Sequence, residues 1–545
     1  MKAECIDYRQ LPGQNPLFLE YLYQYDRVSS LYSCPVHFNL EHLKRRADSV
    51  LKNPPPYPRD QLVQLLTKFN RRVGAGEQVF RNLEKLKSPM TVAVVTGHQL
   101  GLFGGPAFAV YKALTAVRLA QILEEEGYSA VPVFWLASDD SDFQEVRSAS
   151  FFSNEGALFS VSYPGPRKND ARMVGTVSLG AVGECLHRVE KRGPKGEFHA
   201  QVLKMLQETY THTRSFQEGL GSWLAYLFGS HGLILFDALL SGYRAAVPSL
   251  FAVAIEKRRA IVEALQERAE ILKEKGFRPQ VRVEDSESLI FWMAGQKRYK
   301  LEYAEEGYSN KSRQSLKFSE RQLLNELDSG VENLGPNVLL RPILQDHLLP
   351  TVVYVGGPSE VAYFAQVSAI SPFWNMEMAV FPRVGMTVVD RKAQRLLKKY
   401  ELQVSDILNL TPKEVIQNVV EKTESTQILH RFDRLQGDLE SDLESLRADI
   451  GRTDPTVAGM LEGAQRKILY QMEKVQKRFV ANYWNRRADF GHHLDYLYSR
   501  LYPNAKLQER VINFNQFLGE EGPHFVERLM GIVNPFCASH QVIYL

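Results

Sequence analysis

Two glycine-rich turns and one cluster of acids carry the side chains in this sequence that are best suited to chemistry. The first turn covers residues 96–106, between the apolar run 92–95 and an amphipathic stretch that reaches residue 120. Glycines let the backbone approach a ligand closely, and a helix that starts behind them attracts an anion. The spacing matches neither the Walker motif nor the dinucleotide fingerprint. The residues expected to bind phosphate here are Thr96, Gly97, Gln99, Gly101, Gly104, Gly105 and Lys112.

Acidic residues follow the next apolar run, 130–137, which we expect to be a second buried strand. Ligands of open parallel sheets bind beyond the carboxyl ends of the strands, so these acids and the first turn should share one crevice. Closely spaced carboxylates bind magnesium, an amino group or sugar hydroxyls, but they also occur as helix caps and solvated acids. A histidine in the first turn is a candidate base, although histidines in turns often act only as donors. The candidate catalytic residues are His98, Asp139, Asp140 and Asp142, and Asp139 and Asp140 are also the candidates for magnesium.

A second glycine turn, residues 356–360, follows the apolar run 352–355 and precedes another helical stretch. A serine and a glutamate in the first turn of that helix suit the helix dipole, or serve only as a structural cap. An arginine and a glutamine upstream are able to hold a carboxylate or a phosphate. The residues expected to bind substrate are Arg341, Gln345, Gly356, Gly357, Ser359 and Glu360.

The elements that position these motifs predict an α/β fold. Strand, crossover helix and strand in succession indicate right-handed βαβ units with a parallel sheet. The apolar run 381–390 is expected to add one more strand. The expected parts are a helical segment packed on the core (1–90), a catalytic core (91–395) with insertions at about 151–230 and 276–335, a helical arm (396–503) and a tail docked on the core (504–545).

Apolar residues beyond residue 391 recur at three- and four-residue steps, from Ile428 to Ile450 and again from Met460 to Phe479. The break between the two runs contains Pro455, which suits the first turn of a helix. This pattern predicts an antiparallel helical hairpin with coiled-coil spacing. Because two helices bury little surface by themselves, we expect a homodimer through the hairpin, the alternative being that it packs back on the core.

Length, charge and cysteine content argue against several classes of protein. The chain has 545 residues, which is too long for one core, and a net charge of +3, which is too small for a general nucleic-acid or membrane binder. No apolar run approaches the roughly 20 residues that span a bilayer, and the acidic amino terminus does not fit a signal peptide. Cys5, Cys34, Cys185 and Cys537 form no CxxC pair, which fits a reduced compartment. We therefore expect a cytoplasmic protein.

Five motifs taken together resemble those of one family. They are residues 96–106 with Lys112, 132–135 with the acids that follow, Arg341-Pro342 with Gln345, 356–363, and 507–510. Over essentially the whole chain they are similar to the bacillithiol-biosynthesis cysteine-adding family, the cysteine ligases of the last pathway step. The resemblance implies a Rossmann-like core like that of class I nucleotidyltransferases, connecting insertions, and a coiled-coil arm that pairs two subunits. It also implies that L-cysteine is joined to the amine of glucosaminyl-malate, with ATP as the inferred cofactor.

Two positions depart from the pattern of that family. The family usually has Gln where this chain has His98. After the second strand it usually has Glu-Asp-His-Asp, where this chain has Asp139-Asp140-Ser141-Asp142. The histidine of the family is therefore replaced by Ser141, so no catalytic histidine is assigned at that position, and His98 on the neighbouring strand end is a candidate to replace it.

Amide formation needs an activated carboxyl group and a free amine. We expect nucleotide phosphates on the first turn, the acids to bind magnesium or to steer the sugar amine, and Arg341, Ser359 and Glu360 to hold the malate or sugar part. The sequence leaves open whether the activated cysteine is an adenylate or an acyl phosphate. Two other functions compete with this one: a nucleotidyl or glycosyl transferase that uses the same crevice, and a non-catalytic scaffold built on the coiled coil. Glycine turns and acids at several strand ends favour an enzyme over a scaffold.

Overall fold

The computed structural model describes residues 1–35, 38–153, 156–167, 170–193, 196–304, 307–311, 313, 315–330, 332–421, 425–485 and 488–545. These residues form two compact units. The larger unit comprises Lys2–Thr387 and Glu509–Ile543, and the smaller comprises Val388–Gln508 with Met1 and Tyr544–Leu545. Among the helices of the described residues, none is long and apolar enough to cross a membrane.

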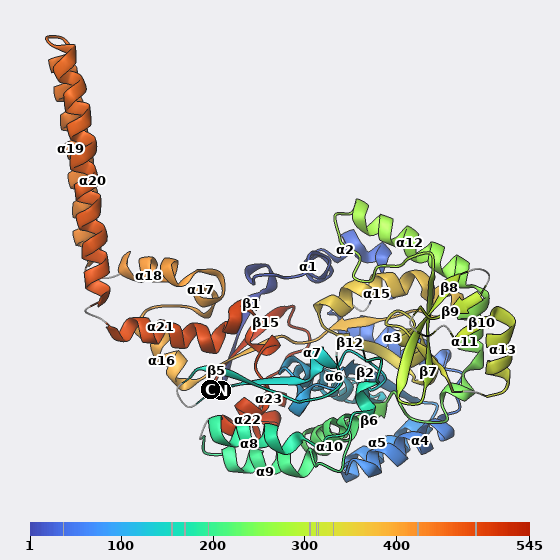
Figure 1. The fold of residues 1–545 in the computed structure, drawn as a ribbon. Helices are drawn as coiled ribbons and strands as arrows, with labels where there is room; N and C mark the ends of the chain where they lie inside the picture. The colour runs from blue at the N-terminus through green and yellow to red at the C-terminus, as the bar shows by residue number, and fades with distance from the viewer. Residues whose placement is uncertain are drawn as a thin grey trace. The chain divides into compact units, whose positions relative to one another are not determined.

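A five-stranded parallel sheet forms the centre of the larger unit (Figure 1). The strands lie in the order β13-β12-β2-β3-β6, and every neighbouring pair is parallel. The chain order reverses between β2 and β12, which is where α/β proteins bind ligands beyond the carboxyl ends of the strands. The predicted α/β class with a parallel sheet is confirmed. The bounds are β2 (Thr91–His98), β3 (Ser129–Leu136), β6 (Ile234–Asp237), β12 (Thr351–Gly356) and β13 (Val380–Pro382).

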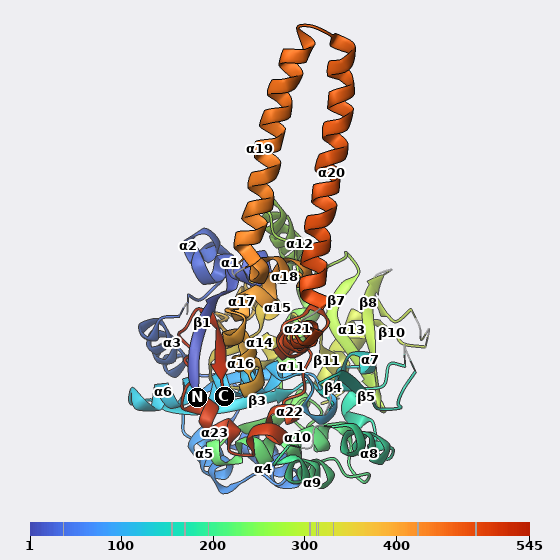
Figure 2. The same ribbon diagram turned by 90° about the vertical axis from the view of Figure 1, so that its left-hand side faces the viewer.

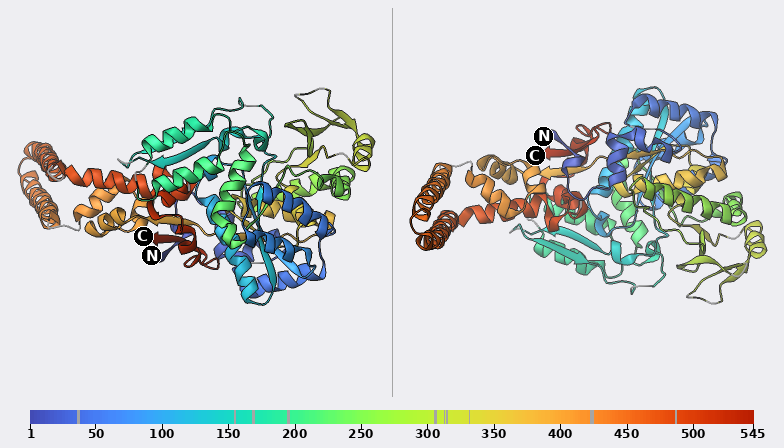
Figure 3. Two further views of the ribbon diagram at one scale, coloured as in Figure 1. Left: turned by 90° about the horizontal axis from the view of Figure 1, so that it is seen from below. Right: turned by 90° about the horizontal axis from the view of Figure 1, so that it is seen from above.

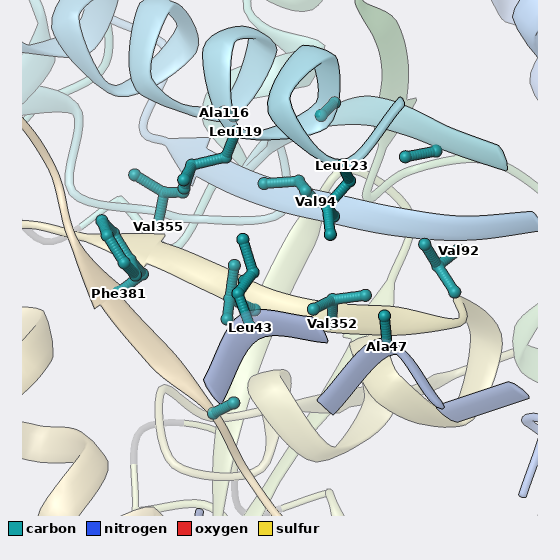
Figure 4. Close-up of a cluster of buried hydrophobic side chains, with 14 of the residues drawn as sticks. Leu43, Ala47, Val92, Val94, Ala116, Leu119, Leu123, Val352, Val355 and Phe381 are labelled. Carbon is teal, nitrogen blue, oxygen red and sulfur yellow. The ribbon is translucent and has the colours of Figure 1, made fainter. Parts of the chain in front are cut away.

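Two helices pack on one apolar cluster of this sheet (Figure 4). They are α6 (Phe108–Glu125), which follows the first glycine turn, and α3 (Leu40–Lys52). Side chains alternate along a strand, so every second residue of β2 faces this cluster. Each large aliphatic side chain buried here stabilises the fold by about 1.5–3 kcal/mol. The labelled side chains are Leu43, Ala47, Val92, Val94, Ala116, Leu119, Leu123, Val352, Val355 and Phe381.

Two smaller sheets lie in the segments expected to be insertions. The first is an antiparallel hairpin of β4 (Ser148–Phe152) and β5 (Leu158–Ser162). The second is antiparallel and has the order β10-β9-β8-β7-β11. Its strands are β7 (Glu287–Ala294), β8 (Lys297–Ala304), β9 (Gly307–Ser309), β10 (Lys317–Ser319) and β11 (Leu334–Pro336). Strand β8 matters for function because it brings Arg298 to the candidate site.

The remaining helices of the larger unit connect and cover these sheets. They are α1 (Pro16–Tyr23), α2 (Tyr25–Val28), α4 (Arg59–Arg72), α5 (Glu77–Lys87), α7 (Phe143–Val146), α8 (Val182–Arg192), α9 (His199–Thr209), α10 (Phe216–Phe228), α11 (Pro248–Glu256), α12 (Arg258–Glu274), α13 (Glu320–Asp328), α14 (Arg341–Leu348), α15 (Pro358–Ile370), α22 (Asn515–Glu521) and α23 (Phe525–Met530). Helix α6 contacts both β2 and β3, as the crossover of a βαβ unit must.

The run 381–390 is not one strand, as the sequence predicted, but parts of two strands in different sheets. It contains the end of β13 and then β14 (Met386–Val389), which joins the three-stranded sheet β1-β15-β14. The chain changes sheets at Gly385, where a side chain would collide with the hydroxyl of Tyr8 and with His540. The first and last strands, β1 (Lys2–Asp7) and β15 (Ser539–Tyr544), are neighbours in this sheet, and Figure 3 shows both termini beside each other. The tail therefore ends in a strand of this sheet.

The smaller unit contains the predicted antiparallel helical hairpin (Figure 2). Its long helices are α19 (Ser425–Gly451) and α20 (Pro455–Asn485), and Asp454 caps the second by accepting from the Thr456 amide at 2.9 Å. Arg447 and Glu462 form an ion pair at 2.8 Å between the two helices. The hairpin prediction is confirmed. The other helices are α16 (Arg391–Lys399), α17 (Val404–Asn409), α18 (Pro412–Glu421) and α21 (Ala488–Leu501).

Candidate functional site

A cavity of about 450 Å³ opens at the carboxyl ends of β2, β3 and β12, where the strand order reverses. Both glycine turns and the acidic cluster contribute to its lining, so the sequence motifs do share one crevice. Its wall combines aromatic rings with charges of both signs. The lining residues are Gly97, His98, Gln99, Phe108, Lys112, Trp135, Ala137, Asp139, Asp140, Glu145, Arg298, Pro336, Asn337, Val338, Arg341, Tyr354, Gly357, Pro358, Ser359, Glu360, Tyr363, Arg383 and Arg510.

Lys112 connects the two glycine turns beneath this cavity. It lies on α6 with only 1% of its surface exposed. Its Nζ donates to the carbonyl of Gly97 at 2.7 Å and forms an ion pair with Glu360. Burial lowers the pKa of Lys112, although Glu360 acts in the opposite direction. Lys112 does turn inward, but its charge is already paired with a carboxylate of the protein.

Glu360 caps the helix that follows the second turn. Its Oε2 accepts from the Gly357 amide at 2.8 Å, and its Oε1 accepts from the Tyr354 hydroxyl at 2.6 Å. Burial opposes ionisation of Glu360, but the Lys112 ammonium outweighs it and lowers the pKa of this carboxyl. The capping alternative thus accounts for Glu360, whereas its neighbour Ser359 is exposed and faces the cavity.

Asp139 and Asp140 both line the cavity but lie in different surroundings. Asp140 accepts from Arg298 Nη2 and from Gln99 Nε2, each at 2.6 Å. Burial raises the pKa of Asp139, although Arg298 and Arg244 act in the opposite direction. Asp140 is therefore held by two donors, whereas the raised pKa of Asp139 makes its carboxylate a better proton acceptor than an ordinary aspartate.

The other positions of the acidic cluster have structural contacts. Asp142 is exposed, lies outside the cavity lining and caps α7 by accepting from the Glu145 amide at 3.3 Å. This matches the helix-cap alternative rather than a catalytic role. Ser141 accepts from Arg298 Nε at 3.3 Å. In the described part of the chain, no three side chains of His, Cys, Asp or Glu are grouped to hold a metal ion, and the magnesium site stays a prediction.

His98 lies at the end of β2 and faces the cavity. Its ring makes an edge-to-face contact with Phe108 at a centroid distance of 4.8 Å. Burial, together with the positive charges of Lys112 and Arg383, lowers the pKa of His98 to about 3. Its imidazole is therefore neutral at pH 7 and a weak proton acceptor, which argues against the predicted role as a general base.

Arg341 begins α14 and faces the cavity between two aromatic rings. Its guanidinium lies 4.7 Å from the ring centroid of Tyr354 and 5.7 Å from that of Trp135. Its Nη1 donates to Gln345 at 3.0 Å, and Gln345 donates in turn to Asp346 at 3.0 Å. Gln345 is fully buried outside the cavity lining, so it positions Arg341 and does not itself contact a ligand in the cavity.

Three nitrogen atoms of side chains that line the cavity are buried without a hydrogen-bond partner among the described residues. They are Nη2 of Arg341, Nε of Arg383 and Nε1 of Trp135. A buried donor left unpaired costs about 1–3 kcal/mol, so such groups need an explanation. Acceptor oxygens of an anionic ligand would satisfy them.

Arg383 reaches the cavity because the chain leaves the central sheet after β13. Its Nη1 and Nη2 donate to the two carboxylate oxygens of Glu509 at 3.0 and 2.5 Å. Glu509 also accepts from the Met386 amide at 2.8 Å. Burial opposes ionisation of Glu509, but Arg383 outweighs it and lowers the pKa of this carboxyl. The pair therefore fixes the C-terminal segment beside the cavity.

The glycine loop predicted as a phosphate cradle is packed into the protein. The amide of Gly101 donates to Gln99, that of Gly105 to Leu102, and that of Gly104 to the Tyr210 hydroxyl at 2.9 Å. These three glycines therefore offer no free N–H group to a phosphate, contrary to the prediction. Gly104 has a φ of +93°, and a side chain there would collide with Trp223.

Side-chain amides from the C-terminal segment fix the shape of this loop. Asn513 donates to the carbonyl of Phe103 at 3.0 Å and to that of Gly105 at 2.8 Å. Asn515 donates to the same Phe103 carbonyl at 2.7 Å. Thr96, also predicted to bind phosphate, is buried and donates to the Val355 carbonyl at 2.8 Å. Gly101, Gly104, Gly105 and Thr96 therefore support the wall of the cavity without lining it.

The structure brings most of the predicted residues together and leaves others in supporting positions. Those that line the cavity are Gly97, His98, Gln99, Lys112, Asp139, Asp140, Arg341, Gly357, Ser359 and Glu360. Those outside the lining are Thr96, Gly101, Gly104, Gly105, Asp142, Gln345 and Gly356.

Sequence reasoning did not assign three arginines that line the cavity. Arg298 comes from the second insertion, Arg383 from the run read as one strand, and Arg510 from the C-terminal segment. The sequence could have pointed to Arg383, because a charged residue inside the apolar run 379–389 needs a buried partner. Arg298 had none, since its place depends on the packing of a separate sheet.

Comparison with known proteins identifies the family. A family model described as "Bacillithiol biosynthesis BshC, N-terminal Rossmann-like domain" matches residues 1–384. A second, "Bacillithiol biosynthesis BshC, C-terminal coiled-coil domain", matches residues 386–545. Together they confirm the Rossmann-like core and the coiled coil.

Relatives with the same name match along the full length. A protein from Solibacter usitatus, named "Putative cysteine ligase BshC", is 32% identical over 100% of both chains. A protein of the same name from Koribacter versatilis is 30% identical over 100% of both chains. Another from Salinibacter ruber is 28% identical, over 97% of this chain and 96% of that protein. With a Rossmann-like core, a coiled-coil hairpin and relatives of this extent, the chain belongs to the bacillithiol biosynthesis BshC family.

Proposed function

We propose that this protein joins L-cysteine to the amine of glucosaminyl-malate by forming an amide bond, with ATP as the source of energy. The names of the relatives support the reaction class, since they describe cysteine ligases. The observation that carries the proposal is that one cavity holds both unpartnered buried donors and the half-buried carboxyl of Asp139. Such a cavity suits a ligand that has both carboxylates and an amine.

The malate part is assigned to the end of the cavity near Arg341. The unpartnered Nη2 of Arg341 and Nε1 of Trp135 are donors that a carboxylate accepts from. Ser359 adds an exposed hydroxyl at the start of α15. Because Arg341 is held by Gln345, it loses little freedom on binding.

The amine of the sugar is assigned to Asp139. An ammonium group has no lone pair, so it must lose a proton before nitrogen attacks the activated carboxyl carbon of cysteine. Asp139 has a pKa raised by burial, which makes it a better proton acceptor than an ordinary aspartate. The new C–N bond forms as the activating group leaves with its electron pair, and the proton passes to Asp139.

ATP would convert the cysteine carboxylate into an electrophile, as either an adenylate or an acyl phosphate. The cavity fits an anion through its cationic side chains rather than through loop amides. Arg510 is the clearest contact for phosphates, because it is exposed at the cavity and forms no ion pair within the described part of the chain. Magnesium, if used, is assigned to Asp139 and Asp140, since it commonly binds one or two carboxylates together with phosphates.

The proposal also includes a homodimer formed through the coiled coil. The protein is proposed to act in the cytoplasm. Large apolar side chains of the hairpin are exposed, with 72% of Met460 and 55% of Leu435 accessible. An apolar depression of about 410 Å³ on the same hairpin is lined by Phe432, Ile468 and Val475, among others. A second copy of the chain would cover these surfaces. Light scattering of the purified protein, with a Leu435→Glu variant as comparison, tests the dimer.

Mass spectrometry after incubation of the protein with cysteine, glucosaminyl-malate, ATP and magnesium tests the reaction. The expected product is the amide, and its absence under all nucleotide conditions would contradict the proposal. Isotope tracing distinguishes the routes, because an adenylate releases pyrophosphate and AMP whereas an acyl phosphate releases phosphate and ADP. Transfer of a nucleotidyl or glycosyl group instead would identify the alternative enzyme. Intact thiol levels in cells that carry Asp139→Asn would favour the scaffold.

A further inference from the structure

Two cysteines far apart in the sequence meet at the surface of the larger unit. Cys5 lies on β1, and Cys537 precedes β15 by two residues. Their Sγ atoms are 3.1 Å apart although 532 positions separate them in the chain. Both are free thiols, Cys5 is exposed and Cys537 is partly exposed. A disulfide requires an S–S distance of about 2.05 Å, so closing this pair needs a movement of only about 1 Å.

The backbone around the pair is held by contacts that do not involve sulfur. The hydroxyl of Tyr23 accepts from the Tyr8 amide at 2.9 Å and donates to the Ala538 carbonyl at 2.7 Å. One side chain thus links residues close to each cysteine. The amide of Cys537 itself donates to Asn534 at 3.2 Å. Because β1 and β15 are also neighbours in one sheet, the two sulfurs stay close in the reduced protein.

We propose that Cys5 and Cys537 form a reversible dithiol–disulfide site. The oxidant is a low-molecular-weight disulfide, RSSR. One thiol, as its thiolate, attacks RSSR to form a mixed disulfide, releasing one RSH after protonation. The second cysteine attacks the protein sulfur of the mixed disulfide, which forms the Cys5–Cys537 bond and releases a second RSH. Two protein thiols are oxidised, and one RSSR is reduced to two RSH.

The surroundings also indicate how fast this site reacts. Partial desolvation of its sulfur, followed by the contact with Cys537, raises the pKa of the Cys5 thiol to about 11. Only the thiolate attacks a disulfide, so Cys5 reacts slowly at neutral pH and faster as the pH rises. The inference does not depend on the reaction in the cavity.

Peptide mapping of the full chain tests this site without any substrate. The protein is equilibrated with glutathione and glutathione disulfide at a series of ratios, its free thiols are alkylated in denaturant so that buried cysteines also react, and it is digested without reduction. The expected result is a peptide pair joined by Cys5 and Cys537, formed in proportion to the ratio and lost on addition of dithiothreitol. Cys34 and Cys185 serve as internal controls and are expected in their alkylated form.

Single variants separate an intramolecular bond from nonspecific oxidation. In Cys5→Ser and in Cys537→Ser the linked pair disappears, and the remaining cysteine carries at most one glutathione. Circular dichroism checks that both variants fold like the parent protein. If Cys5 and Cys537 stay separately alkylated at the most oxidising ratio, or if each links to another cysteine or another chain, the proposal is wrong. The mapping of the parent protein gives this answer even where a variant fails to fold.

Discussion

The buried ion pair of Arg383 and Glu509 allows a quantitative test of how the C-terminal segment is attached. Only 3% of the Arg383 side chain and 2% of the Glu509 side chain are exposed. The substitution Glu509→Gln keeps the shape and one acceptor oxygen but removes the charge. The guanidinium of Arg383 is then left buried without a counter-ion. Glu270→Gln is the matched control, because Glu270 pairs with Lys273 at 2.7 Å and their side chains are 66% and 58% exposed.

The expected magnitudes differ by several kcal/mol. Removing one partner of a buried ion pair costs about 3–5 kcal/mol, whereas an exposed pair is worth about 0.2–1 kcal/mol. Unfolding entropy is about 2 cal/mol/K per residue, so over the larger unit the loss at Glu509 corresponds to a fall in Tm of about 3–6 °C. Glu270→Gln should lower the Tm by about 1 °C or less by the same conversion.

Thermal unfolding followed by tryptophan fluorescence measures this difference. Four of the five tryptophans, Trp135, Trp223, Trp292 and Trp374, lie in the larger unit, so the signal reports mainly on it. Equal shifts for the two variants would refute the reasoning, since the buried pair would then be no more important than a surface pair.

The pH dependence of the Glu509 variant provides a second check. Although burial opposes ionisation, Arg383 lowers the pKa of Glu509 in the folded protein below its unfolded value of about 4.3. A carboxyl with a lowered folded pKa stabilises the protein above the unfolded pKa, and this contribution is lost as the pH falls through the folded pKa. The Tm gap between parent and Glu509→Gln should therefore be constant near neutrality and narrow below about pH 4.

Three further predictions concern the cavity. His98→Gln should retain the ligase rate at pH 7, because a neutral imidazole with a pKa of about 3 is a poor base; a large loss in kcat would restore His98 as a catalyst. Asp139→Asn should lower kcat by about 10²–10⁴-fold, whereas Asp142→Asn should not, since asparagine caps a helix equally well; equal losses would contradict the separation of their roles. Gln345→Leu should raise the KM for the proposed malate-bearing substrate about tenfold or more with a smaller change in kcat, because Arg341 loses a charge-assisted hydrogen bond worth about 1.5–3 kcal/mol. Steady-state kinetics measures the effect of each of these substitutions.

The fold was accessible from sequence where local pattern and burial agree. The apolar run 92–95 is completely buried, and the periodic run from Ile428 to Ile450 is a helix. Patterns of period two and 3.6 report on such elements directly. The prediction of one strand over 381–390 was wrong because apolar character does not reveal where a chain passes from one sheet to another. That change depends on the crowding of Gly385 by Tyr8 and His540, which are distant in the chain.

The location of the site could be predicted from the sequence, but the roles of most of its residues could not. Residues at strand ends met in one cavity because parallel strands place their carboxyl ends together. The roles of individual residues depended on partners from elsewhere. Sequence could not show that Tyr210 would occupy the Gly104 amide, or that Glu360 would neutralise Lys112. Arg298 shows the same limit, since a separate sheet brings it to Asp140.

The contact between Met386 and Glu509 has a practical consequence for the helical arm. The Met386 amide donates to Glu509 at 2.8 Å, so the chain leaves the larger unit and re-enters it at neighbouring points. Residues 388–508 are therefore an inserted domain in the topological sense. A variant in which residues 388–508 are deleted, and a short glycine-serine linker joins Thr387 to Glu509, should still fold as the larger unit. Such a core would allow the cavity to be studied apart from the helical arm.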